Sequence, residues 1–128
     1  MSDAVVVDAS VVLALLHDEP MGNFDGGRIA GSAISAVNFA EVMTKLISDG
    51  MPNDAASNAA MQLDLKIFPF DERSAQLAAQ LWPVTRPAGL SLGDRACIAL
   101  GLSLDALIIT ADRAWGKVDF GGRLIVIR

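Results

Sequence analysis

The chain has 128 residues, of which 52% are hydrophobic, and it carries a formal net charge of −5 at pH 7. A chain of this length and apolar content is expected to bury a core as one domain over residues 1–128, which argues against intrinsic disorder. The acidic balance, with a sequence pI of about 4.6, argues against a protein that coats nucleic acid through a basic face or tail.

Hydrophobic periodicity and capping residues predict strands that alternate with helices. The predicted strands are Val5–Asp8, Ala33–Ser35, Lys66–Phe70, Leu107–Thr110 and Leu124–Ile127. The predicted helices run from an N-cap at Ser10 to His17, from Ala36 to Ser48, from an N-cap at Asn53 to Leu65, from an N-cap at Asp71 to Trp82, from an N-cap at Ser91 to Leu102, and as one turn from Asp112 to Trp115. The alternation predicts an α/β fold with a mainly parallel sheet of about five short strands and helices on both faces.

Two segments are less regular. Residues 22–31 are rich in glycine, and we expect at most a short helix there, from Phe24 to Ile29. Pro83 to Gly89 contains two prolines and is predicted to be a loop.

The sequence predicts neither a membrane span nor an internal disulfide. The longest apolar stretch, residues 4–16, is much shorter than the ~20 residues that a span needs. The N-terminal Met1–Asp3 lacks the basic segment of a signal peptide. The only cysteine, Cys97, suits a reducing cytoplasm and is expected in the core. With one histidine and one cysteine, the chain cannot build a zinc site of the usual kind.

Four carboxylates each lie beside an apolar segment: Asp8, Glu41, Asp94 and Asp112. Asp8 and Asp112 lie at or just past the carboxyl ends of predicted strands, and Glu41 and Asp94 lie in the first or second turn of predicted helices. In an open parallel sheet, ligands bind at the carboxyl ends of the strands, so the four acids are compatible with one shared site. Two carboxylates about 5 Å apart repel by roughly 3 kcal/mol at an effective dielectric of ~20, so a converging set calls for a cation.

Each acid also has a purely structural alternative. These are local amide capping for Asp8, an ion pair with Lys45 for Glu41, a capping box with Ser91 for Asp94, and a turn or an ion pair with Arg113 for Asp112. Against the surface alternative, Glu41 shares a helical face with Val37, Ala40 and Thr44, which is expected to point inward. If the acids meet, their all-oxygen ligand set selects Mg²⁺ or Mn²⁺, and the reaction that fits best is phosphodiester hydrolysis.

Neighbouring polar residues could support such a site. Candidates for orienting the carboxylates are Ser10, Asn38 and Thr110. Candidates for contacting substrate phosphates are Arg86, Arg95, Arg113 and Lys117. Elsewhere, His17 is expected on the surface, and Trp82 and Trp115 are expected in the core or against a partner rather than as base-stacking platforms.

Four stretches of the chain resemble the PIN domain, and more closely the VapC-type ribonuclease toxins of prokaryotic toxin–antitoxin pairs. They are Val7–Ser10, Ser35–Val42, Leu90–Ala96 and Ile109–Trp115. The resemblance spans nearly the whole chain, although Asp25-Gly26-Gly27 is less typical of the helix expected there. It implies a three-layer α/β/α sandwich, Mg²⁺- or Mn²⁺-dependent endoribonuclease activity, a homodimer, and a VapB-like antitoxin whose C-terminal segment blocks the site.

The resemblance also implies roles for the acids. Asp8 and Asp94 would be the firmest direct metal ligands. Glu41 would bind directly or through water, or would help to activate the nucleophile, and Asp112 would serve a second metal present only with substrate.

Two other functions remain open at this point. One is a catalytically inert PIN-like scaffold that binds protein partners. The other is a Mg²⁺-dependent phosphatase or phosphoryl-receiver domain, which is disfavoured because Ala9-Ser10 follows Asp8 and no lysine follows the late strand at Thr110. The sequence does not indicate which RNA an enzyme of this kind would cut.

Overall fold

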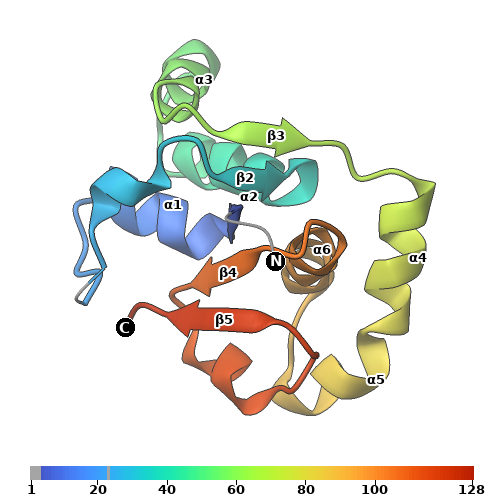
Figure 1. The fold of residues 1–128 in the computed structure, drawn as a ribbon. Coiled ribbons are helices and arrows are strands. Elements are labelled where there is room, and N and C mark those ends of the chain that lie inside the picture. The colour runs from blue at the N-terminus through green and yellow to red at the C-terminus, as the bar shows by residue number, and fades with distance from the viewer. Residues whose placement is uncertain (1–3, 23) are drawn as a thin grey trace.

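In the computed structural model, which describes residues 4–22 and 24–128, a parallel sheet forms the centre of the molecule (Figure 1). Its strands are β1 (Val5–Val7), β2 (Ala33–Ser35), β3 (Lys66–Phe68), β4 (Leu107–Thr110) and β5 (Arg123–Val126). The order across the sheet is β3-β2-β1-β4-β5, and every neighbouring pair is parallel. The predicted α/β class with a parallel sheet is confirmed. The prediction about Met1–Asp3 lies outside the described residues.

Helices connect the strands in the described part of the chain. The α-helices are α1 (Ala9–Leu16), α2 (Ala36–Ser48), α3 (Asn53–Met61), α4 (Glu72–Gln80), α5 (Trp82–Thr85) and α6 (Leu92–Ser103). The 3₁₀ helices are η1 (Gly26–Ile29), η2 (Arg86–Ala88) and η3 (Arg113–Lys117). No helix in the described ranges is both long and apolar enough to cross a bilayer.

Two hydrophobic clusters cover the two faces of the sheet. Val6 and Ile108 point to a cluster built with α4, α6 and η3, whereas Val7 and Ile109 point to one built with α1, η1, α2 and α3. Neighbouring residues alternate because side chains along a strand point to opposite faces. The central strands β1, β2 and β4 are therefore largely buried on both sides, which explains their continuous apolar sequences and gives the three-layer sandwich, whereas the edge strands β3 and β5 are more exposed.

Two predicted helix caps are wrong. Asp8, not Ser10, caps α1, because the Asp8 side chain accepts a hydrogen bond from the Val11 amide and Ser10 already lies within the helix. Pro52 occupies the cap position of α3, so Asn53 is its first helical residue. That helix ends at Met61 rather than near residue 65, and the chain then reverses through Asp64 with a φ of 54° before β3.

The predicted loop from Pro83 to Gly89 is also wrong, because this segment is helical. It contains the single turn of α5 and the 3₁₀ turn of η2. Both prolines lie in first turns, where a backbone amide has no acceptor within the helix and its absence costs nothing. Gly89 ends the segment in the left-handed region at φ 73°.

Smaller differences concern element length and the faces that are buried. In the Gly-rich segment, the helical part is only η1, whose first amides are capped by Asp25. The expected inward face of α2 is wrong: Ala40, Glu41 and Thr44 are exposed. The helix instead buries the ridge that carries Asn38 and Val42, because this ridge faces the sheet.

The single-residue predictions for Trp115, Cys97 and His17 are confirmed, since the first two side chains are fully buried and the third is exposed. Trp82 is 51% exposed and so is not part of the core.

Gly101 gives a test of this packing. A Cβ at Gly101 on α6 would overlap the buried Ile108 side chain on β4. Although alanine is intrinsically the better helix former, Gly101→Ala is expected to lower the free energy of unfolding by about 1–3 kcal/mol through overpacking. Urea denaturation measures this, with Gly116→Ala as control because its Cβ would meet only Val126 at 4.0 Å. Equal stability of the two variants would contradict the packing described here.

Candidate metal centre at the carboxyl edge of the sheet

Asp8 lies at the carboxyl end of β1 and is only 4% exposed. One carboxylate oxygen, Oδ1, accepts hydrogen bonds from the Ser10 hydroxyl at 2.6 Å and from the Val11 amide at 3.1 Å. The other, Oδ2, accepts one from the Thr110 hydroxyl at 2.7 Å. The carboxylate is therefore fixed in orientation from two sides.

Burial is the main reason that the pKa of Asp8 is raised from 3.8 to about 6. The hydrogen bonds from Ser10, Thr110 and Val11 lower the pKa, but they do not offset the desolvation. The negative charge of Asp94 raises it further. A negative charge is thus held at a place where it is costly unless a cation joins it.

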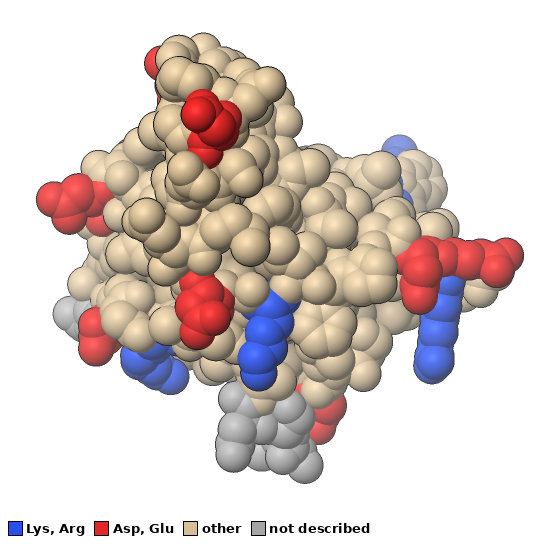
Figure 2. All heavy atoms as spheres, turned by 90° about the horizontal axis from the view of Figure 1, so that it is seen from above, with Lys and Arg blue, Asp and Glu red and all other residues tan. Residues whose placement is uncertain are grey.

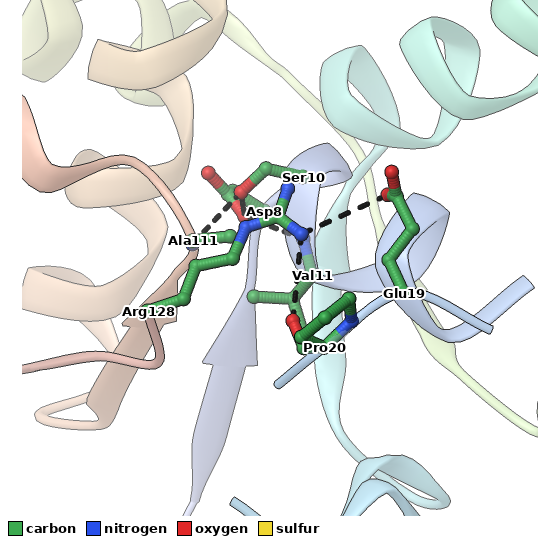
Figure 3. Close-up of polar contacts among 7 residues, drawn as sticks. All are labelled: Asp8, Ser10, Val11, Glu19, Pro20, Ala111 and Arg128. Carbon is green, nitrogen blue, oxygen red and sulfur yellow. Dashed lines mark hydrogen bonds and ion pairs between the residues drawn. The ribbon is translucent and has the colours of Figure 1, made fainter. Parts of the chain in front are cut away.

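The hydroxyl groups around Asp8 also hold the loop after β4. The Ser10 Oγ accepts a hydrogen bond from the Ala111 amide at 2.9 Å (Figure 3). The Thr110 Oγ1 accepts one from the Asp112 amide at 3.1 Å. The two hydroxyl oxygens lie 3.4 Å apart. Asp8 is consequently tied through the Thr110 hydroxyl to the backbone amide of Asp112, and through the Ser10 hydroxyl to that of Ala111.

Glu41 reaches the same edge from α2. The Asn38 side-chain amide donates to Glu41 Oε1 at 2.8 Å and to the backbone carbonyl of Gly93 at 2.9 Å. Asn38 is 1% exposed, and its Oδ1 has no donor among the described residues. This amide joins α2 to the start of α6 and orients the Glu41 carboxylate. The alternative pairing of Glu41 with Lys45 is not formed, because Lys45 donates to Asp49 at 3.2 Å.

Asp94 lies in the first turn of α6 and closes a capping box. Its Oδ2 accepts from the Ser91 amide at 2.8 Å, and its own amide donates to the Ser91 hydroxyl at 3.2 Å. Partial burial raises the pKa of Asp94, the Ser91 contacts lower it, and the Asp112 carboxylate raises it. In the described residues no hydrogen bond engages Asp94 Oδ1, which leaves that oxygen available for a ligand.

Gly93 is a site residue that sequence reasoning missed. A Cβ at this position would lie 2.5 Å from Glu41 Oε2 and 2.8 Å from its Cδ, so the Glu41 carboxylate rests directly on the bare backbone. The available signal was a glycine in the first turn of a helix, which costs about 1 kcal/mol relative to alanine and usually has a packing reason.

The four acids are linked by electrostatic effects on neighbouring pKa values. Asp94 raises the pKa of Asp8, Asp112 raises that of Asp94, and burial raises that of the Cys97 thiol, with further contributions from Asp8, Asp94 and Glu41. Cys97 follows Asp94 by one helical turn on α6, and its thiol is fully buried. Within the described ranges, however, no three acidic, histidine or cysteine side chains are close enough to hold one metal ion together.

The residue chemistry fits a hard divalent cation. All four candidate donors are carboxylates, the donor type that Mg²⁺ and Mn²⁺ prefer. Asp8 is pre-oriented by three donors, and Gly93 leaves room for the carboxylate of Glu41. Asp94 and Asp112 are each held as a cap through one carboxylate oxygen, so their other oxygens are the ones that would meet a shared ion.

The predicted phosphate contacts differ in their surroundings. Arg95 is largely committed to packing, since its Nη1 donates to the Ala78 carbonyl at 3.0 Å. Arg86, Arg113 and Lys117 are exposed. Arg128 forms an ion pair with Glu19 Oε1 at 3.9 Å and donates a hydrogen bond to the Pro20 carbonyl at 3.4 Å (Figure 3). Neither contact involves the four candidate acids.

The chain is a parallel α/β/α sandwich with an acidic edge at the carboxyl ends of its strands, where ligands bind in proteins of this class. A model of the PIN domain matches residues 5–121, and the chain belongs to this family.

Solved structures share the fold. VapBC2 from Rickettsia felis, bound to a DNA fragment from its promoter, aligns with a TM-score of 0.75 at 13% identity over 98% of this chain and 99% of the other. VapBC-5 from Mycobacterium tuberculosis gives 0.67 at 20% identity over 99% of both chains. VapC20 from the same organism, a toxin that cleaves the sarcin–ricin loop, gives 0.66 at 16% identity over 84% and 88%. No curated protein matches the chain.

The raised pKa of Asp8 predicts a pH-dependent cost in metal-free protein. Between about pH 4 and pH 6 the folded protein keeps a proton that the unfolded chain has lost, so stability falls as pH rises and the cost is complete above pH 6. Asp8→Asn, which cannot ionise, is expected to gain roughly 1–3 kcal/mol over the parent at pH 7.5 and little at pH 3.5.

Chemical denaturation in EDTA across this pH range measures the difference in free energy of unfolding between Asp8→Asn and the parent. The contributions of the other titrating groups cancel in this difference. Asp71→Asn is the matched control, because Asp71 is an exposed N-cap. A gain for Asp8→Asn that does not change with pH would contradict the buried carboxylate.

Proposed function

We propose that the chain is a Mg²⁺- or Mn²⁺-dependent endoribonuclease and the toxin of a type II toxin–antitoxin pair. The observation that carries the proposal is the buried carboxylate of Asp8, held by three donors and electrostatically coupled to Asp94, on a chain of the PIN family. Asp8 also caps α1, but an uncharged Ser or Asn performs that task as well, so capping alone does not account for a buried charge that is costly without a cation.

Each acid has a distinct task in this proposal. Asp8 and Asp94 hold the metal, Asp8 because it is locked in place and Asp94 through its Oδ1. Asp112 binds a second ion when substrate is present. When bound, the divalent ion lowers the pKa of an attacking water and neutralises charge on the phosphate.

Glu41 is placed to accept the proton of the attacking water. Its carboxylate is exposed, and Asn38 fixes its direction by donating to Oε1. As the water oxygen bonds to phosphorus, its proton passes to Glu41 and the leaving ribose oxygen departs on the opposite side. Asn38 and Gly93 act in this scheme by positioning Glu41, because neither reaches the reacting atoms.

The structural relatives support the biological role in this proposal. Several of them are VapBC complexes, which supports a VapB-like antitoxin as partner and regulator of this chain. A homodimer, which the resemblance to VapC-type toxins implies, is also part of the proposal. The relative that cleaves the sarcin–ricin loop supports structured RNA as a substrate class.

Asp94→Asn tests the enzymatic part. We expect RNA cleavage and growth arrest to fall at least about 100-fold, because a metal ligand is lost, while asparagine can still accept from the Ser91 amide and preserve the helix cap. Cleavage of total RNA by antitoxin-free protein with Mn²⁺ measures this, with Asp71→Asn as control for a cap outside the site.

Metal binding gives an independent readout. Millimolar Mg²⁺ or Mn²⁺ is expected to raise the melting temperature of the parent protein and not that of Asp94→Asn, because a ligand that binds only the folded state stabilises it. Unchanged cleavage by Asp94→Asn would sink the proposed site. A parent protein that neither cleaves RNA nor responds to metal would support the inert scaffold instead.

Gly93→Ala tests the cradle beneath Glu41. The added methyl group displaces the Glu41 carboxylate by a few tenths of an ångström or more, so we expect kcat to fall roughly 10- to 100-fold with little loss of fold stability. Single-turnover cleavage and circular dichroism measure the two effects. Gly116→Ala should leave both unchanged, and a fully active Gly93→Ala enzyme would remove Glu41 from the reaction.

A further inference from the structure

Trp82 begins α5 and exposes 51% of its surface, which is unusual for the largest apolar side chain. The Arg86 guanidinium lies over the indole ring at 5.3 Å from its centroid. Val84 and Leu92, close in sequence, are 47% and 53% exposed. The segment thus presents a flat aromatic ring with a planar cation on it, within an apolar surround. We call Trp82 and Arg86 the stacking pair.

The backbone below the stacking pair is rigid. Pro83 and Pro87 fix φ in two successive turns. Thr85 is fully buried, and its hydroxyl donates to the Leu81 carbonyl at 2.8 Å. The Leu90 amide then returns to the Thr85 carbonyl at 3.4 Å. The exposure of Trp82 is therefore held by the fold and is not a consequence of a loose loop.

The stacking pair adjoins the acidic edge. Arg86 starts η2, which contacts η3, and η3 is capped by the carboxylate of Asp112. In the other direction along the chain, η2 leads directly to Ser91 and the capping box of Asp94. The same short segment thus connects the exposed ring with two of the four acids.

Cationic side chains gather on these two elements. Arg86 lies on η2, and Arg113 and Lys117 lie on η3; all three are exposed, and no ion pair in the described part of the chain engages them. On the face seen in Figure 2, acidic and basic side chains are scattered, and some of opposite charge lie side by side. Although the chain has a net charge of −5, η2 and η3 carry exposed positive charge close to two of the acids.

We propose that the stacking pair binds an unpaired nucleobase of a single-stranded RNA segment that runs past the acidic edge. The base stacks on the exposed part of the Trp82 ring. Arg86, Arg113 and Lys117 contact the neighbouring phosphates. Every base has an aromatic face, so this contact adds affinity without demanding a sequence. The inference rests on the proposed nuclease function, and it names the substrate as single-stranded or looped RNA.

The chemistry favours RNA over a second copy of the chain. Two copies that met through this surface would bring the exposed cations of η2 and η3 on each copy together, and these like charges repel, whereas the same cations attract phosphate. An aromatic ring with an adjacent guanidinium is the usual combination for a single strand, in which stacking and backbone charge contribute together.

Affinity is measured with the full-length Asp94→Asn protein, which leaves the RNA intact, and a fluorescently labelled eight-nucleotide single-stranded RNA in low-salt buffer with Mg²⁺. Trp82→Ala is expected to weaken binding about tenfold, and Trp82→Phe to retain most of it, because phenylalanine still stacks. Arg86→Ala should weaken binding and reduce its salt dependence, whereas Arg86→Lys should keep the salt dependence. Ile67→Ala, a 42% exposed position on β3, is the matched control for lost apolar surface.

Intrinsic fluorescence provides a second readout, because Trp115 is fully buried and Trp82 is the exposed indole. RNA is expected to quench the Trp82 signal and to protect it from acrylamide. RNA affinity that is equal in Asp94→Asn and in the double variant Asp94→Asn/Trp82→Ala, with no quenching, would overturn the proposal. This holds even if the enzyme with an intact Asp94 cleaves RNA. Quenching without cleavage by the active-site-intact protein would instead reject the nuclease function and keep the RNA contact. A dimer that dissociates on Trp82→Ala, with RNA affinity unchanged, would assign this surface to a second copy.

Discussion

The burial of one carboxylate, that of Asp8, is the constraint on which the site depends. The hydroxyls of Ser10 and Thr110 and the Val11 amide hold this group almost out of contact with solvent. These contacts also fix the start of α1 and the end of β4, because the same two hydroxyls accept hydrogen bonds from backbone amides in the loop that follows β4. Desolvation outweighs the hydrogen bonds, so the protein keeps an electrostatic cost at its carboxyl edge.

Capping and site roles coincide in this protein rather than exclude each other. Asp8 caps α1, Asp94 closes the box with Ser91, and Asp112 caps η3. A carboxylate has two oxygens, so one can satisfy helix amides while the other faces a ligand. Helix starts and strand ends meet at one edge of a parallel sheet, which places these caps within electrostatic reach of one another. The residues that begin three of the helices are thus also the residues that place negative charge at this edge.

The acidic composition and an RNA substrate are compatible because the charge is unevenly placed. The acids lie at the strand ends, whereas unpaired cations lie on η2 and η3 beside them. Family membership gives the class of the protein, and the structural relatives, at 20% identity or less, share its fold. Two local features of this chain bear on its site: Gly93 beneath Glu41, and the exposed ring of Trp82.

The sequence by itself predicted the sheet and its parallel direction, and it made the four acids compatible with one shared edge, because these follow from short-range periodicity and strand–helix alternation. Only the tertiary structure decided which face of α2 is buried, that Trp82 is exposed while Trp115 is not, and that the prolines after Trp82 lie in helical turns. The role of Gly93 was also hidden, since it depends on Glu41, 52 positions earlier in the chain. Such contacts join residues that local pattern cannot relate, and the direction in which a helix faces is chosen by the packing of the whole core.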